Sequence, residues 1–384
     1  MTKDDQDADF HIPSEPEGFK NLLKGVSLKN TIHELHTSEL DSGSDVTNEQ
    51  FALLRAYYPP YVKRTAFGKY CKKELDLMKA RASARELLDA SLSYGNMLRV
   101  EGLNYPNAFV RFLQQLRGLS LTKADKKAME DPAEPRPDAR RKAQSPPAER
   151  IETKSRRRRA ARIVRYFEDI LSQEGDEMSE TSNGSQDRNV ESRKMASNPD
   201  GHPQCADESI VNACCINLLE TLAQLIPSKR SNWTLARLSF TAEFERGEYT
   251  AITDGALYTK DKHIVQAIVE VKPHIRSSIL TKVEKQEASE IVAWMKKSNG
   301  DGLPQLGGHR LLVGQNQHEV YLMFAKPDEE YQAYLDSSHN VKNDQGFLSI
   351  QACGPWSLTD RGEDLDELCE ILLAIIIRAS AEVV

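Results

Sequence analysis

The stretch Glu248–Pro273, EYTAITDGALYTKDKHIVQAIVEVKP, carries the pattern that decides the fold of the C-terminal half. Residues 248–258 and 263–272 are rich in apolar and β-branched residues, and a polar turn separates them. If the two segments form an antiparallel hairpin, Asp254 falls directly or diagonally opposite Glu270. The sequence therefore predicts two carboxylates close together on neighbouring strands.

Side-chain alternation on the second of these strands separates polar from apolar residues. Glu270 and Lys272 share one face, and Val269 and Val271 share the other. Two carboxylates a few ångströms apart repel each other and raise one another's pKa. A divalent cation between Asp254 and Glu270 is the simplest remedy.

Composition and charge limit the classes of protein to consider. The chain has 384 residues, enough for about two domains. Charged residues make up 28%, aromatic residues 7%, and mean hydropathy is -0.57, so we expect a substantial part to be unfolded. The net charge of -7 hides a segregation, because Lys and Arg crowd Arg136–Arg165 while Asp and Glu dominate Glu168–Glu191. The acidic pI of about 5.8 therefore does not exclude a nucleic-acid partner.

The cysteines and apolar runs point to an intracellular protein without a membrane partner. The cysteines show no paired CxxC spacing, which argues against a zinc site and a disulfide framework and favours a reducing compartment. They are Cys71, Cys205, Cys214, Cys215, Cys353 and Cys369. No charged and then apolar leader opens the sequence, and the longest apolar run, Ile371–Ile377, is far shorter than the ~20 residues that cross a bilayer.

Composition also divides the chain into segments. We expect a disordered lead at 1–17, a helical N-terminal region at 18–121, a disordered basic and acidic linker at 122–206, and a folded domain at 207–384. Within the linker, Arg156–Arg159 form a basic cluster that a nuclear import receptor can bind or that can neutralise phosphates. The first interpretation predicts a nuclear protein. The alternative is a solvated charge run that keeps the linker soluble.

The C-terminal domain is predicted to be α+β, with a mixed sheet flanked by helices. The expected order is helix 207–226, strands 235–245, 248–258 and 263–272, helix 276–298, strands 309–315, 318–325 and 347–351, and helix 363–381. Gln315-Asn316-Gln317 indicates a tight turn between two of these strands.

This order resembles the core of the PD-(D/E)XK nuclease superfamily. The family has a helix, three strands with Asp on the second and Glu-x-Lys on the third, then a helix and a strand, which Asp254, Glu270 and Lys272 match. The resemblance is to the restriction-endonuclease-like or RecB-like branch, in a form similar to proteins encoded in fungal genomes, and covers roughly residues 205–325. It implies a restriction-endonuclease-like fold and metal-dependent hydrolysis of phosphodiester bonds, most simply in DNA.

The resemblance also implies roles for residues. Asp254, Glu270 and the backbone carbonyl of Val271 would bind Mg²⁺ or Mn²⁺, since hard cations prefer oxygen ligands. Lys272 would orient or deprotonate the attacking water and offset charge on the phosphorus centre. One departure is Thr253, which stands where the family pattern has Pro.

Helical geometry adds two inward-facing polar residues. At about 100° per residue, Gln286 and Glu290 share a stripe with Ile279, Val283 and Trp294, which we expect to face the sheet. Buried polar groups need partners, and a metal, a lysine or a phosphate would supply them. By resemblance to the RecB-like branch, Gln286 would support the centre. The alternative is that both residues lie at the wet edge and cap loop groups.

The first helix of this domain offers an extra acid. Glu208 lies near the helix start on its apolar face, whereas Glu220 lies on the opposite side. The resemblance makes Glu208 a candidate for the centre, and the alternative is an acid that complements the helix dipole. Glu243 and Glu245 on the next strand are further possibilities.

Three hypotheses about function follow. The first is a metal-dependent nuclease, and the second is a nuclease fold without turnover that binds nucleic acid or protein. The third is a regulatory protein that acts through its N-terminal helices. Convergence of Asp254, Glu270 and Lys272 in space would favour the first.

Overall fold

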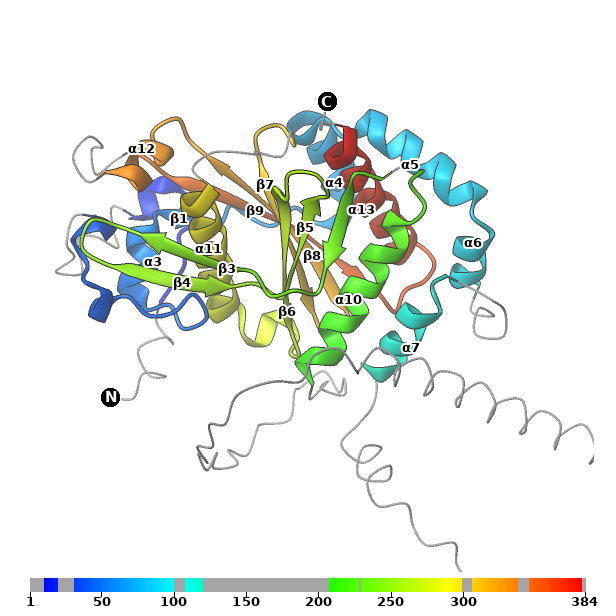
Figure 1. The fold of residues 1–384 in the computed structure, drawn as a ribbon, viewed down its shortest axis with the longest axis horizontal. Helices are drawn as coiled ribbons and strands as arrows, with labels where there is room; N and C mark the ends of the chain where they lie inside the picture. The colour runs from blue at the N-terminus through cyan, green and yellow to red at the C-terminus, as the bar shows by residue number, and fades with distance from the viewer. Residues whose placement is uncertain are drawn as a thin grey trace, which may run out of the picture. The chain divides into compact units, whose positions relative to one another are not determined.

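The computed structural model describes residues 10–19, 31–99, 108–119, 207–227, 229–298, 306–337 and 345–381. Every described residue belongs to a compact unit formed by residues 1–127 and 203–384 (Figure 1). Arg156–Arg159 and the rest of the linker predicted at 122–206 lie outside the described residues, as does most of the predicted lead. No helix in the described part of the chain is both long and apolar enough to span a bilayer.

A seven-stranded mixed sheet organises the C-terminal half, and the α+β class with flanking helices is confirmed. Its spatial order is β1, β9, β8, β7, β6, β5, β2, with β6–β7 and β1–β9 parallel and the other pairs antiparallel. The strands are β1 Ala56–Tyr57, β2 Ser231–Thr234, β5 Gly255–Thr259, β6 Val265–Lys272, β7 Arg310–Asn316, β8 Glu319–Pro327 and β9 Leu348–Ser357. A separate hairpin consists of β3 Ser239–Glu243 and β4 Glu248–Ile252.

Helices cover both faces of the sheet (Figure 1). The helices are α3 Asn48–Leu54, α4 Arg64–Tyr70, α5 Met78–Ala90, α6 Leu92–Leu98, α7 Val110–Gly118, α10 Glu208–Ala223, α11 Leu280–Ser298, α12 Tyr331–Asp336 and α13 Asp364–Ala381, besides short 3-10 and π turns. Residues of α5, α7, α10 and α13 pack on the face that carries Val269 and Val271. Helix α11, α3 and the β3–β4 hairpin pack on the face that carries Ile268. The predicted alternation along β6 is therefore confirmed.

The single arm predicted at 248–258 is wrong. The backbone N–H of Thr253 donates to Leu238 O of the hairpin at 3.0 Å, whereas the N–H of Asp254 donates to Val269 O of the large sheet at 2.9 Å. The chain therefore changes partner between these two residues, and β4 and β5 belong to different sheets. Apolar alternation alone does not reveal such a break, because both halves have the same period.

Other boundaries also differ. The strand predicted at 235–245 is shorter, and β2 before it was not predicted. Strand β9 runs well past the predicted 347–351, because a register shift carries the ladder across Gly354 and Pro355. The tight turn predicted at Gln315-Asn316-Gln317 is present but lies at Gln317 and His318, because Gln315 and Asn316 still pair with β8. Gln317 takes the left-handed conformation with φ 56°.

The N-terminal region contributes to both cores. Strand β1 extends the large sheet, and Phe51 and Tyr58 pack with α11. Phe67 and Phe112 pack with α10 and α13 on the other face. The described parts of 18–121 and 207–384 thus share their hydrophobic cores.

Candidate functional site

Asp254 is fixed at the point where the chain enters the large sheet. Strand register pairs Gly255 with Val269, so Asp254 follows opposite Glu270, as predicted. The buried Asp254 carboxylate accepts a hydrogen bond from the backbone N–H of Val271 at 3.1 Å. Its own carbonyl accepts one from Asn212 Nδ2 of α10 at 3.0 Å. The acid is therefore oriented by β6 and by α10.

The glycine after Asp254 is required by close packing. A Cβ at Gly255 would lie 2.6 Å from the carbonyl oxygen of Thr234 and 2.9 Å from Cδ1 of Ile216. Both contacts are closer than real Cβ atoms allow, so any side chain would push β2 or α10 away. The Asp-Gly pair thus brings the acid close to β6.

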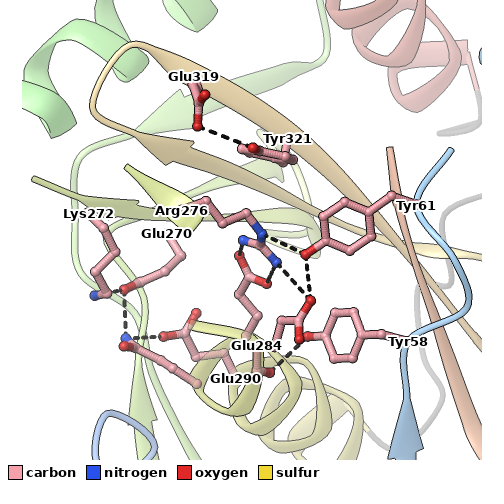
Figure 2. A network of polar contacts seen from close by, with 11 residues as sticks. Tyr58, Tyr61, Glu270, Lys272, Arg276, Glu284, Glu290, Glu319 and Tyr321 are labelled. Atoms are coloured by element: carbon pink, nitrogen blue, oxygen red, sulfur yellow. Dashed lines mark hydrogen bonds and ion pairs between the residues drawn. The ribbon is translucent and has the colours of Figure 1, made fainter. Parts of the chain in front are cut away.

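Glu270 is the centre of a buried polar cluster (Figure 2). Lys272 Nζ donates to Glu270 Oε1, and Gln286 Nε2 donates to the same oxygen at 2.6 Å. Gln286 also donates to Glu290 Oε1 at 2.8 Å. The interpretation that Gln286 and Glu290 point inward is thus confirmed over their placement at the wet edge of the helix.

Electrostatics in this cluster favour bound protons or cations. Burial raises the pKa of Glu270 to about 8, Lys272 opposes this shift, and the charge of Asp254 adds to it. The expected repulsion between the two carboxylates is thus present but smaller than the effect of burial. Burial also raises the pKa of Glu290, and the charge of Glu270 adds to that shift. For Lys272, burial lowers the pKa, but the Glu270 carboxylate outweighs this effect and raises it.

Glu208 lies at the rim of the cluster, and Arg237 joins it to Asp254. Arg237 Nη2 lies 3.0 Å from Asp254 Oδ1 and 3.7 Å from Glu208 Oε1. The Glu208 side chain is 40% exposed, so its placement on the buried face of α10 is only partly right. Sequence reasoning missed Arg237, which lies in an irregular loop without periodicity. Glu245 lies elsewhere, 3.8 Å from His33 Nδ1.

The carboxylates of this cluster suit a divalent cation that needs only one or two side-chain ligands from the protein. In the described part of the chain, no group of three or more His, Cys, Asp or Glu side chains is arranged to hold a metal ion. Mg²⁺, however, is commonly bound by one or two carboxylates and keeps waters or substrate oxygens in its other positions. Asp254, Glu270 and Glu290 are three buried acids, whereas the cations that contact them are the Lys272 ammonium and the largely exposed Arg237 guanidinium. Among described residues, Glu290 Oε2 also has no hydrogen-bond partner. The buried acids therefore outnumber the buried cations, and a bound divalent ion would balance this charge.

A second buried network lies beside the first half of α11 (Figure 2). Arg276 donates to both carboxylate oxygens of Glu287, at 2.6 and 2.7 Å, and to Tyr61 Oη at 3.1 Å. Tyr61 donates to Glu284 Oε1 at 2.5 Å. The Arg276 guanidinium also stacks over the ring of Tyr321, 4.9 Å from its centroid. The network ties the N-terminal segment to α11 and to the loop that follows Lys272.

Glu284 gives this network a pH dependence. Burial raises its pKa to about 7, although Tyr61 and Arg276 oppose the shift. The folded state therefore binds a proton more tightly than the unfolded state does. Stability from this group is complete below the unfolded pKa and falls as pH rises toward about 7, by up to about 3 kcal/mol.

We predict that Glu284→Gln flattens this pH dependence. Because glutamine does not titrate, the variant should lose less unfolding free energy than the wild type between about pH 5 and pH 8. Urea unfolding at several pH values measures the difference. Glu248→Gln, at an exposed position in β4, is the matched control. Parallel curves for the wild type and Glu284→Gln would contradict the assignment.

An open cleft of about 570 Å³ lies apart from both networks. Its lining includes Tyr57, Tyr70, Glu74, His309 and Lys326, and none of its lining residues belongs to the Asp254 cluster. The cleft and the acidic cluster are therefore separate places, and charged groups converge in the cluster.

The structure brings Asp254, Glu270, Lys272 and Gln286 together and leaves Glu208 at their rim. Sequence reasoning also missed Asn212 and the Arg276 network. The signal available for that network was the separation of Glu284 and Glu287 by three residues, which places both on one side of α11. Comparison with family models, curated proteins and solved structures finds no match to this chain.

Proposed function

We propose that this chain is a metal-dependent nuclease of the restriction-endonuclease-like class that hydrolyses phosphodiester bonds, most simply in DNA. One observation carries the proposal: Asp254, the residue before β5, lies opposite Glu270 of β6, and Lys272 and Gln286 are hydrogen-bonded to Glu270. A buried acid pair beside a lysine is uncommon without a chemical role, because each buried charge opposes folding.

Asp254, Glu270 and the carbonyl of Val271 would hold Mg²⁺ or Mn²⁺. When bound, such an ion polarises a phosphoryl oxygen and lowers the pKa of water. Gln286 holds the Glu270 carboxylate in one orientation, and the backbone N–H of Val271 does the same for Asp254. The protein thus fixes the direction of both acids before a ligand arrives.

Lys272 supplies positive charge at the end of β6. Its ammonium donates to Glu270 and is mostly buried, so its position is defined. A raised pKa keeps it protonated at neutral pH. We infer that Lys272 stabilises negative charge that develops on phosphoryl oxygens and orients water through its N–H groups.

Substrate affinity and location are assigned to other parts of the chain. Basic residues of the linker, above all Arg156–Arg159, are proposed to bind a nuclear import receptor and place the protein in the nucleus. Nearby basic residues would add sequence-independent contacts to phosphates.

We predict that Mg²⁺ or Mn²⁺ stabilises the fold through Asp254. A ligand that binds only the folded state adds about 2.7 kcal/mol at about 100 times its Kd. Thermal melts with and without each ion should show a higher Tm in the wild type. Asp254→Asn keeps an oxygen for the Val271 N–H but loses the charge, so its Tm should not respond.

The control for this experiment is Asp261→Asn, at an exposed position in the β5–β6 turn. Its Tm should respond to metal as the wild type does. An absent response in the wild type, or an equal response in Asp254→Asn, would disprove a metal site at these residues.

A further inference from the structure

Arg237 is an exposed basic residue in direct contact with the proposed site. It lies in the loop between β2 and β3, and its guanidinium reaches back to Asp254 Oδ1 at 3.0 Å. The same nitrogen lies 3.7 Å from Glu208. The Arg237 side chain is 63% exposed, whereas the Asp254 side chain is 5% exposed. The solvated Arg237 side chain thus covers the buried Asp254 carboxylate.

We propose that the Arg237 guanidinium neutralises Asp254 in the metal-free protein. When a divalent ion binds this carboxylate, Arg237 is released and binds a substrate phosphate. The proposal rests on the proposed function. It assigns Arg237 two positions, one in the metal-free protein and one with metal and substrate.

Competition for Asp254 supports the first position. Of the Asp254 carboxylate oxygens, Oδ2 accepts from Val271 N–H and Oδ1 meets Arg237. A divalent ion held by the Asp254 carboxylate would repel the guanidinium and compete with it for this acceptor. The Arg237 side chain is 63% exposed, so water can take over its hydrogen bonds when a divalent ion displaces it from Asp254.

The chemistry of arginine supports the second position. The guanidinium is planar and always charged, and its paired N–H donors match the geometry of phosphate oxygens. Lys272 cannot serve in this way as easily, because it is 17% exposed and held by Glu270. Arg237 also has an exposed neighbour, Leu235, so the loop presents both charge and apolar surface at the rim.

The experiment measures metal binding and DNA binding separately, without turnover. Mn²⁺ and Ca²⁺ are titrated calorimetrically into the full chain and into Arg237→Ala, Arg237→Lys, Asp254→Asn and the control Arg246→Ala. Arg246 is an exposed arginine in the β3–β4 turn. Binding of a labelled DNA oligonucleotide, single-stranded and duplex, is followed by anisotropy in Ca²⁺ and in EDTA.

We expect Arg237→Ala to bind Mn²⁺ about two- to fivefold more tightly than the wild type, because a competing cation is gone. Its DNA affinity should fall about tenfold in Ca²⁺ and stay unchanged in EDTA, where the wild-type guanidinium is held at Asp254. Arg237→Lys should recover part of the DNA affinity, and Arg246→Ala should match the wild type.

Two results would overturn the proposal in different ways. In the first case, the wild type binds Mn²⁺ and Asp254→Asn does not, so the metal site is supported. If Arg237→Ala then keeps the wild-type affinity for Mn²⁺, or loses DNA affinity equally in Ca²⁺ and in EDTA, Arg237 is not released by metal. If the wild type and Asp254→Asn bind Mn²⁺ alike, the proposed function fails and the role of Arg237 fails with it.

Discussion

Lys272→Ala should lower kcat for DNA cleavage by about 10²-fold or more while DNA affinity stays nearly unchanged. The ammonium is mostly buried and contacts Glu270, so its charge is available where negative charge would develop in the transition state. Affinity should come mostly from phosphate contacts elsewhere. Cleavage of single-stranded and duplex DNA in Mg²⁺ or Mn²⁺ gives kcat, and a titration at fixed salt gives Kd.

The fold should survive this substitution. Without Lys272, the buried Glu270 takes up a proton more readily, because its pKa is already raised to about 8. A thermal melt checks that the variant is folded, and Lys262→Ala in the exposed β5–β6 turn is the matched control. Equal background cleavage by the wild type and Lys272→Ala would remove the catalytic assignment. A nuclease fold that binds nucleic acid or protein without turnover would then explain the chain better.

Local pattern was sufficient to predict the acid pair. The position of Asp254 opposite Glu270 follows from strand register, and the inward direction of Gln286 and Glu290 follows from helical period. Both are short-range properties of the backbone. From β6 to β8 the order of strand, helix, strand and strand was predicted for the same reason, whereas β2 and the break between β4 and β5 were not.

Long-range packing was not predictable in this way. Helix α11 is buried on all sides from Val283 to Met295. Tyr58 and Tyr61 of the N-terminal region contact Glu284, and α3 and the β3–β4 hairpin also pack on this helix. Arg237 reaches Asp254 only because the chain changes sheets before that residue. Neither contact has a periodic signal, since each joins segments through tertiary structure alone.

Removal of Glu287 should destabilise the fold strongly. Arg276 and Glu287 are each 1% exposed and form a bidentate pair. Glu287→Ala leaves a buried guanidinium without its carboxylate, which costs about 3–5 kcal/mol. Glu284, 3.9 Å from Arg276, is too distant to replace two short hydrogen bonds. Urea unfolding at neutral pH measures the loss.

The cost should come from the unpaired charge and not from lost contacts, which a double variant distinguishes. Arg276→Met with Glu287→Leu removes both charges and keeps apolar volume, so it should recover most of the stability lost in Glu287→Ala. Asp89→Ala breaks the exposed pair with Arg85 and should cost less than about 1 kcal/mol. If Glu287→Ala costs no more than Asp89→Ala, the buried pair does not hold α11 to the loop after Lys272. If the double variant is as unstable as Glu287→Ala, packing around Arg276 matters more than its charge.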